Sequence, residues 1–541
     1  MITYRKSPGM IVMILLVYFI GTGMIQARED EDYQQIIEGN TWVDSTSGEM
    51  TPAKKQAMAW LEDHQPLGRE VATYIWHHPE LGLGEHLSSE ILQDFLERSG
   101  FEVEAGVADQ ETGFVATWGA GEPVIGFHAE FDALPGLSQV AGQPEQQAIT
   151  EEAPGHGCGH NLFGTYSSMA AVAVKEALRE EGIRGTVKVY GTPAEETLVG
   201  KAFFVKYGIY ADADVVISWH PSGDNRVVYS SSLAMDNFKV RFTGIAAHAA
   251  SDPWEGRSAL DAVELMSVGM NYMREHIRPT SRIMSSITNG GRAPNVVPPK
   301  AEVWYYVRAP HYDYVTELMD WTRQMAEAAA MMSQTEMEFL KITGVWEYLP
   351  NNVLARVGNR NVQLIGPPAW TEEDQAAGKP LSGTKDVTEP PYYSDQTEHP
   401  DLDAPFEWAS SGGSIDEANT SWVVPMVRFV SATKPKGVPG HSWQQVAGNC
   451  LPQAFKGALT AAKYMATTAL DLYLNPELVE AAWEEHQQST ELYGPFADPV
   501  EDLPVPTFQL MHGMQENEVP KQWEDEPYSY PELLEQYRLE E

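Results

Sequence analysis

The chain has 541 residues, of which 43% are hydrophobic, so it is long enough for two or more domains and is neither disordered nor fibrous. Its formal net charge of −41 argues against a nucleic-acid partner, because the phosphate backbone attracts basic surfaces. Two cysteines in a chain of this length cannot form a disulfide framework.

The N-terminal segment has the pattern of a secretory signal. Arg5 and Lys6 precede an apolar run over residues 11–25, and Ala27 provides a small residue for cleavage. The run is shorter than the roughly 20 apolar residues of a membrane-spanning helix, which favours a cleaved leader over an uncleaved anchor. We therefore expect a signal peptide at residues 1–27 and an exported protein, periplasmic or secreted.

The next part of the chain alternates helical and β-rich patterns. Apolar residues at helical spacing predict one or two helices between Thr51 and Ser99. Nearly continuous apolar runs at 123–128, 186–190 and 214–219 predict strands buried on both faces, with a helix over 162–179 between the first two. This order predicts an α/β catalytic domain with a mostly parallel sheet, whose first part is residues 28–235.

Residues 236–344 predict a second, inserted domain. The order is strand, helix, strand, strand, helix, strand, which is the βαββαβ order of a ferredoxin-like α+β unit. The catalytic domain then resumes over residues 345–475, with a loop-rich stretch at 350–405 and a helix at 453–472. Residues 476–541, rich in proline and acids, are expected to form an irregular acidic C-terminal extension.

Each of the three predicted strands leads into polar side chains. In a parallel sheet the ligand site gathers at the carboxyl ends of the strands, so these side chains are expected to converge. In chain order they are His128, Glu130 and Asp132, then Glu195 and Glu196, then His220.

The glycine-rich turn at residues 155–161 carries Cys158 and His160. Glycines allow close approach to an ion, and a thiolate with an imidazole favours Zn²⁺ or a similar transition metal. The alternative is a surface loop with an incidental thiol. A disulfide between Cys158 and Cys450 is the weaker interpretation, because Cys450 lies near the predicted helix as a small buried residue.

A hydrolytic metal centre needs ligands, an open position for water and a base, and the chain offers all three. Glu195 is free to act as general base and then as acid toward a leaving amine. The alternative for the adjacent glutamates is a solvated acidic pair. The candidate ligands, enough for two ions that share a bridging group, are Cys158, His160, Glu196, His220 and His441.

Several motifs resemble those of the co-catalytic metallopeptidase-type amidohydrolases. They are the segments 155–160, 193–196 and 439–441, and segments 132–139 and 289–298 resemble the p-aminobenzoyl-glutamate hydrolase B subunits in particular. Auxin-conjugate, hippurate and aminoacylase-type hydrolases are relatives of that subgroup. The resemblance covers most of the chain.

This resemblance implies that the five candidate ligands bind two divalent ions, Zn²⁺ or Mn²⁺, and that Glu195 is the base. Asp132 would orient a ligand from behind the metal, and Glu130 would play a similar supporting part. The inserted domain would be a lid and dimerisation module whose His248 reaches the partner's active site to stabilise the oxyanion. From the residues alone, His248 is more often an ordinary surface or core histidine.

The resemblance is less specific for substrate contacts. Asn295 and Arg308 lie on the predicted lid, and Arg292 is an equal candidate for binding a carboxylate, although a salt bridge would explain either arginine. Ser414 and Asp416 resemble a loop near the substrate, where Asn419 stands in place of a frequent acid.

The sequence therefore predicts an exported, metal-dependent amidohydrolase that cleaves the amide bond of N-acyl or N-aroyl amino acids by attack of metal-activated water. We expect a homodimer formed through the lid, and a second subunit type stays open. A dipeptidase or aminoacylase of the same superfamily is the alternative enzyme. A non-catalytic conjugate-binding protein is the other alternative, and the presence of both Glu195 and Glu196 argues against it.

Overall fold

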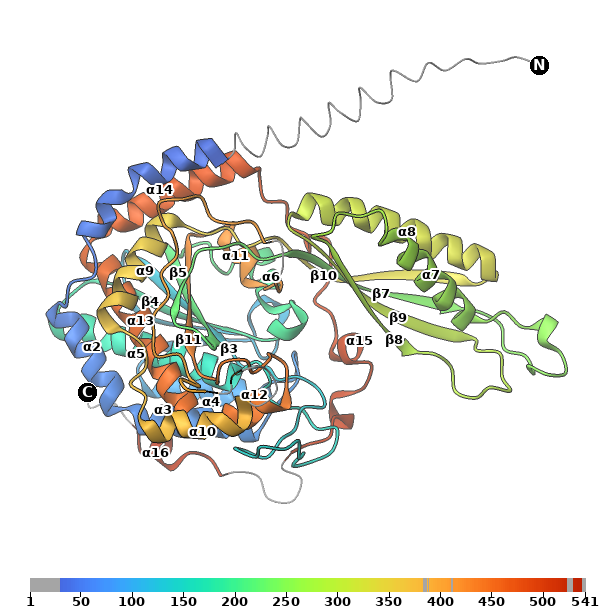
Figure 1. Cartoon of the computed structure of the whole chain (residues 1–541), viewed down its shortest axis with the longest axis horizontal. Helices are drawn as coiled ribbons and strands as arrows, with labels where there is room; N and C mark the ends of the chain where they lie inside the picture. The colour runs from blue at the N-terminus through green and yellow to red at the C-terminus, as the bar shows by residue number, and fades with distance from the viewer. Residues whose placement is uncertain (1–29, 383–386, 388, 410–411, 523–528, 538–541) are drawn as a thin grey trace, which may run out of the picture.

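The computed structural model describes residues 30–382, 387, 389–409, 412–522 and 529–537. The predicted signal peptide, residues 1–27, lies outside the described residues. Within the described ranges, no helix is both long enough and apolar enough to cross a bilayer. The chain forms a rounded α/β body from which a smaller, elongated α+β domain projects (Figure 1).

The body is built around a seven-stranded sheet in the order β1-β2-β4-β3-β5-β11-β6. The four strands β4, β3, β5 and β11 are parallel neighbours, and antiparallel strands are added at both edges. The α/β prediction with a parallel central sheet is confirmed. The strands are β1 (Glu102–Ala105), β2 (Phe114–Ala120), β3 (Val124–Glu130), β4 (Gly185–Thr192), β5 (Val215–Ser222), β6 (Arg226–Val228) and β11 (Met426–Ala432).

Two long helices, α5 (His160–Glu181) and α13 (Pro452–Leu474), cover one face of this sheet. Almost every residue of α5 is buried, and its small side chains allow close packing. A Cβ on Gly164 would lie 2.6 Å from the carbonyl oxygen of Glu130, so glycine lets the helix approach the end of β3. The start of α5 is thereby held next to the carboxyl ends of the strands.

The remaining helices of the body surround this core. The region from Thr51 to Ser99 forms three helices where one or two were expected. These three are α2 (Pro52–Asp63), α3 (Gln65–His77) and α4 (His86–Arg98). The other helices of the body are α6 (Gly200–Lys206), α9 (Asn352–Ile365), α10 (Glu372–Ser382), α11 (Glu417–Ser421), α12 (Trp443–Gly448) and α14 (Pro476–Tyr493). Single 3-10 turns are η1 (Thr41–Ser45), η2 (Val107–Asp109), η3 (Glu195–Thr197), η4 (Pro253–Glu255) and η5 (Glu516–Glu518).

Two expectations about local structure were wrong. The stretch 350–405 was predicted to be loop-rich, yet it contains α9 and α10. The segment after residue 475 was predicted to be irregular, yet it begins with α14, whose Leu478, Val479 and Ala482 are buried. The high density of acids hid this apolar stripe, although only Glu485 among the acids of α14 is buried with it.

The projecting domain has a four-stranded antiparallel sheet in the order β10-β7-β9-β8, covered by α7 and α8. This confirms the inserted ferredoxin-like α+β domain, which we call the lid. Ser258 caps α7 by accepting a hydrogen bond from the backbone N–H of Asp261. The elements are β7 (Ala234–Thr243), α7 (Ala259–Met273), β8 (Arg282–Asn289), β9 (Lys300–Ala309), α8 (Tyr312–Ser333) and β10 (Glu336–Val345).

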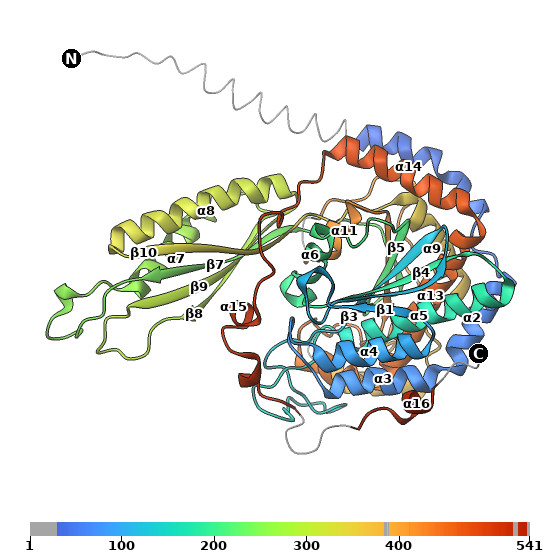
Figure 2. The same ribbon diagram turned by 180° about the vertical axis from the view of Figure 1, so that it is seen from behind.

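Residues 494–522 form a strap that runs from α14 across the junction of body and lid (Figure 2). It includes α15 (Phe508–His512), and the chain continues to α16 (Glu532–Gln536) on the body. Met511 of the strap is buried in a cluster with Leu198 of the body and Met235 of β7. Lys239 of β7 donates hydrogen bonds to the carbonyl oxygens of Leu510 and Met511. The strap therefore fastens the root of the lid to the body.

Candidate metal centre

The glycine-rich turn presents Cys158 and His160 at the N-terminus of α5. Gly159 has a φ of +91°, in the left-handed region that favours glycine. A Cβ on Gly155 would lie 2.4 Å from the carbonyl oxygen of Leu137, so the turn packs too closely for a larger residue. Cys158 and His160 are both buried, which excludes the interpretation of an incidental surface loop.

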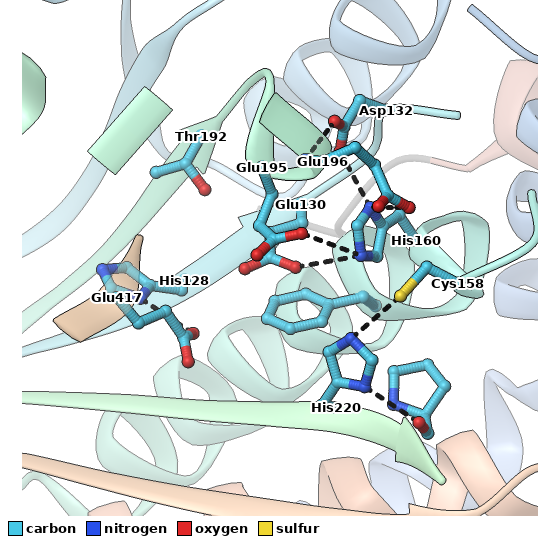
Figure 3. A network of polar contacts seen from close by, with 12 residues as sticks. His128, Glu130, Asp132, Cys158, His160, Thr192, Glu195, Glu196, His220 and Glu417 are labelled. Carbon is cyan, nitrogen blue, oxygen red and sulfur yellow. Dashed lines mark hydrogen bonds and ion pairs between the residues drawn. The ribbon is translucent and has the colours of Figure 1, made fainter. Parts of the chain in front are cut away.

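The adjacent glutamates lie on a tight turn after β4. Ala194 (φ +56°) and Leu198 (φ +59°) flank η3 in the left-handed region, which costs about 1–3 kcal/mol at each non-glycine residue. The backbone N–H of Glu196 donates to Asp132 Oδ2 at 2.9 Å. Because of this turn, Glu195 and Glu196 both reach the region around His160 rather than opposite faces of a strand (Figure 3).

Two groups of possible ligand atoms share the sulfur of Cys158. One group is Cys158, His160 and His220, the other is Cys158, Glu196 and His441, and the atoms within each lie within 4.8 Å of one another. Cys158 Sγ is 3.2 Å from His220 Nε2 (Figure 3). His441 Nε2 is 3.3 Å from Glu196 Oε2. The five predicted ligands thus converge from separate segments, with the thiol in the position of a bridging ligand.

This set of donors fits two divalent transition-metal ions. Sulfur, imidazole nitrogen and carboxylate oxygen are ligands that Zn²⁺ and related ions accept. The buried atoms His160 Nε2 and Glu196 Oε1 make no hydrogen bond within the described part of the chain. Burial raises the pKa of the Cys158 thiol to about 12 and that of the Glu196 carboxyl to about 8. A bound cation would favour the deprotonated form of both groups.

Asp132 lies behind His160 with its carboxylate fully buried. Its Oδ1 is 2.8 Å from His160 Nδ1. A carboxylate at this nitrogen fixes the ring orientation and directs Nε2 toward the other ligands. The contact is the one expected of a residue that orients a metal ligand.

Glu195 belongs to a third group of close, buried atoms with Glu130 and His160. Its Oε2 lies 3.8 Å from His160 Nε2. Burial first, and then the neighbouring carboxylate of Glu130, raise the pKa of Glu195 well above its usual value. Both causes favour the protonated form of this carboxyl group.

Glu130 itself is held by a lysine that the sequence did not single out. The amine of the fully buried Lys201 lies 2.8 Å from Glu130 Oε1 and 2.6 Å from Asp416 Oδ1. Asp416 was expected near the substrate, but its carboxylate faces Lys201 instead. A single lysine in the short helix α6 carries no sequence pattern that would reveal this contact.

A second buried network surrounds His128, which the sequence left unassigned. Its ring nitrogens lie 3.2 Å from Glu417 Oε1 and 3.0 Å from the hydroxyl of Tyr210. Arg428 forms an ion pair with the other Glu417 oxygen at 3.0 Å, and Ser218 donates a hydrogen bond to the same carboxylate. Glu417 is therefore a structural anion that supports the sheet beneath the site.

A cavity of about 440 Å³ opens between the body and the lid beside these residues. The predicted substrate residue Arg308 lines it from β9, and its Nε is buried and makes no hydrogen bond to any described residue. Ser414 lines the cavity as well. The other lining residues are Cys158, Glu195, Glu196, Leu198, His220, Arg226, Val228, Ser230, Ser231, Ser232, Tyr306, Tyr348, Gly412, Gly413, Ile415, Arg428, Val430 and His441.

The other predicted lid residues do not line this cavity. His248, on the loop after β7, and Arg292 and Asn295, on the loop between β8 and β9, are exposed. Figure 1 shows these two loops at the end of the lid that points away from the body. The backbone N–H groups of Ala250 and Ser251 each lie 3.2 Å from His248 Nδ1, which accepts their hydrogen bonds.

The chain matches the peptidase dimerisation domain over residues 234–333, which correspond to the lid. It is 38% identical over 443 residues to the B subunit of p-aminobenzoyl-glutamate hydrolase from Escherichia coli, covering 78% of this chain and 92% of the relative. It is 31% identical over 432 residues to the human Xaa-Arg dipeptidase, covering 76% and 86%. An aminobenzoyl-glutamate utilization protein from Klebsiella pneumoniae has the same fold, with a TM-score of 0.52 at 17% identity over 76% of this chain and 98% of that one. This chain therefore belongs to the M20 peptidase family of metallopeptidase-type amidohydrolases, as an enzyme that hydrolyses carbon–nitrogen amide bonds.

Proposed function

We propose that this enzyme hydrolyses the amide bond of N-acyl or N-aroyl amino acids, such as p-aminobenzoyl-glutamate-like conjugates. The observation that carries the proposal is the sharing of Cys158 between two ligand groups, with the buried Glu195 beside them and a cavity at their side. The name of the 38% identical relative supports the same class of substrate.

The donors Cys158, His160, Glu196, His220 and His441 would hold two ions of Zn²⁺ or Mn²⁺. Ions bound there would polarise the amide carbonyl and lower the pKa of a water molecule.

Glu195 would take the proton from the attacking water and deliver it to the amide nitrogen as the carbon–nitrogen bond breaks. The released amine then leaves with that proton, and Glu195 returns to its starting charge. The raised pKa of Glu195 suits both steps, because a carboxyl must hold the proton between them. Asp132 would keep His160 in one orientation throughout, through the 2.8 Å contact.

On the substrate side, Arg308 would bind the carboxylate of the amino acid, and its position on the cavity with an unused donor supports this. The oxyanion that forms on the carbonyl would be stabilised by His248 from the lid of a second copy. Asn295, which lies beside His248 through the hydrogen bond from the Ala249 N–H, would enter the same site. Arg292 lies on the same loop as Asn295 and would be the alternative contact for the substrate carboxylate.

We propose that the enzyme is a homodimer assembled through the lid. Leu265, Val268 and Tyr272 form an exposed apolar stripe on α7, and β8 is an edge strand with Ile287 half exposed. A contiguous apolar surface beside an open strand edge is typical of a protein–protein interface. A second subunit type stays a possibility that purification of the native protein would test. We also propose that the protein is exported to the periplasm or secreted.

The test is hydrolysis of a panel of acyl and aroyl amino acids by protein reconstituted with Zn²⁺ or Mn²⁺, read by amine release. Conjugates should be cleaved by the wild type and not by Glu195→Gln. A dipeptidase is the second candidate, favoured by the 31% identity to the Xaa-Arg dipeptidase, so dipeptides belong in the same panel. If no amide is cleaved although substrates bind, the protein is a conjugate-binding protein and the proposal is wrong.

A further inference from the structure

A row of three residues crosses the sheet from the metal centre to its far edge. In the register of β5 with β11, His220 lies beside Val430, and in the register of β11 with β6, Val430 lies opposite Arg226. Paired residues point to the same face of a sheet, so all three side chains face the cavity that they line. Strands are spaced by about 4.8 Å, so the backbone of Arg226 lies roughly 10 Å from that of His220.

The next row places a second arginine on the same face, but its charge is already compensated. Arg428 lies opposite Val228 and forms its ion pair with the buried Glu417. Arg226, by contrast, lies 3.6 Å from the carboxylate of Glu398, without a hydrogen bond between them in the described structure. The side chains of both partners are partly exposed, so solvent screening makes this ion pair weak. The Arg226 guanidinium is therefore available to a ligand.

An apolar surface adjoins this guanidinium on the cavity face. Val430 lies between Arg226 and His220, and Val228 lies two residues from Arg226 along β6. A ligand that follows this surface would place methylene groups over Val430 and a carboxylate at Arg226. The amide bond would remain at the end nearer to His220.

We infer that Arg226 determines substrate specificity by binding the side-chain carboxylate of an acidic amino acid, glutamate in preference to glutamine. The inference rests on the proposed function and names its substrate class. Arg308 approaches the cavity from the lid and is left for the α-carboxylate. A basic amino acid at this position would place like charges together, so the same arginine opposes an arginine-releasing dipeptidase activity.

The experiment compares N-(p-aminobenzoyl)-glutamate with N-(p-aminobenzoyl)-glutamine, which have the same shape and differ in charge, on metal-reconstituted enzyme. Wild type should prefer the glutamate conjugate. Arg226→Met should lower kcat/KM for that conjugate by about 10- to 100-fold, mainly through KM, and change the glutamine conjugate by less than about threefold. Arg226→Lys should have a kcat/KM for the glutamate conjugate between those of wild type and Arg226→Met, because lysine keeps the charge without the bidentate geometry.

Glu398→Gln is the matched control, because it removes the competing partner of Arg226 and should leave or strengthen the glutamate preference. A second readout, calorimetric binding of free glutamate and glutamine to wild type and Arg226→Met, does not require turnover. Two outcomes would overturn the inference while the amidohydrolase function stands. One is that Arg226→Met lowers kcat/KM equally for both conjugates. The other is that wild type cleaves neutral conjugates and shows no preference for glutamate. If nothing is cleaved but glutamate binding still depends on Arg226, the proposed function fails and the specificity inference holds.

Discussion

Cys158 and His220 are far apart in the chain, yet the sulfur of one lies 3.2 Å from Nε2 of the other. The contact joins the turn before α5 to the strand β5, because the carboxyl ends of parallel strands meet at one edge of the sheet. Cys158 is also within 4.8 Å of the ligand atoms of Glu196 and His441. One thiol therefore connects both halves of the candidate centre.

This position predicts the outcome of two cysteine substitutions. Cys158→Ser should remove a ligand from both groups and lower the bound metal of the purified protein well below that of wild type, with activity falling by at least about 100-fold. Cys450→Ser is the matched control and should change neither the metal content nor the activity. Cys450 Sγ lies 3.9 Å from Thr73 Oγ1, and Cys450 belongs to none of the ligand groups found among the described residues. Metal analysis of the purified proteins checks this. Normal metal content in Cys158→Ser would show that the thiol is not a ligand.

A separate substitution tests the base. Glu195→Gln should keep its metal, because Glu195 lies outside the two groups that share Cys158, and should lose about 10²- to 10⁴-fold in kcat. The measurement is turnover at saturating substrate together with metal content. Full turnover in the metal-loaded variant would exclude Glu195 as the base.

The sequence predicted the parts of the site that depend on local pattern. Continuous apolar runs placed the strands, and the residues just after each run marked its carboxyl end, so the convergence of the candidate ligands followed from sheet geometry. The glycine-rich turn could be recognised because Gly155 and Gly159 occupy positions that exclude larger residues. The assigned roles of these residues stay predictions until the variants are measured.

Contacts between distant segments could not be predicted in this way. Lys201 meets Glu130 and Asp416 only because α6, β3 and the start of α11 pack together, and no spacing in the sequence encodes that meeting. Arg226 faces the cavity because of the register of β6 against β11, and this pairing joins segments that are far apart in the sequence. The helix α14 was not predicted, because the many acids and prolines of this segment indicated irregular structure and the buried apolar residues of the helix were overlooked.

The partly buried His77 predicts a loss of stability in acid. Burial, and then the neighbouring His78, lower the pKa of His77 to about 4 in the folded protein, whereas the unfolded chain titrates near 6.5. The unfolded state therefore binds more protons between these values, and stability falls as pH drops from about 6.5 toward 4. His77→Gln should recover about 1–2 kcal/mol of that loss near pH 4, a value reduced for partial exposure. Denaturant unfolding at pH 7 and at mild acid measures this, with the exposed His276→Gln as control. The prediction is contradicted if the free energy of unfolding falls between pH 7 and mild acid by the same amount in His77→Gln as in wild type.

The strap predicts that alanine substitutions at two nearby methionines have different effects on the free energy of unfolding. Met511 is fully buried at the junction of body and lid, while Met514 is 37% exposed. Met511→Ala should therefore lower the free energy of unfolding by about 2–5 kcal/mol, and Met514→Ala should have little effect. Thermal and denaturant unfolding of both variants test this. Equal, small effects would mean that the strap does not fasten the lid.

The position of His248 predicts complementation between two inactive variants. His248 is exposed at the far end of the lid and does not line the cavity of its own chain. If it serves the site of a second copy, His248→Ala and Glu195→Gln should each be inactive alone. Co-expressed, they should recover about a quarter of wild-type activity, because half of the dimers are then mixed and each mixed dimer has one intact site. Differently tagged protomers allow the mixed dimer to be isolated and assayed. Adding Val268→Glu on the exposed face of α7 should separate the protomers and abolish the recovered activity. A mixed dimer without activity would show that His248 acts within its own chain or has no part in the reaction.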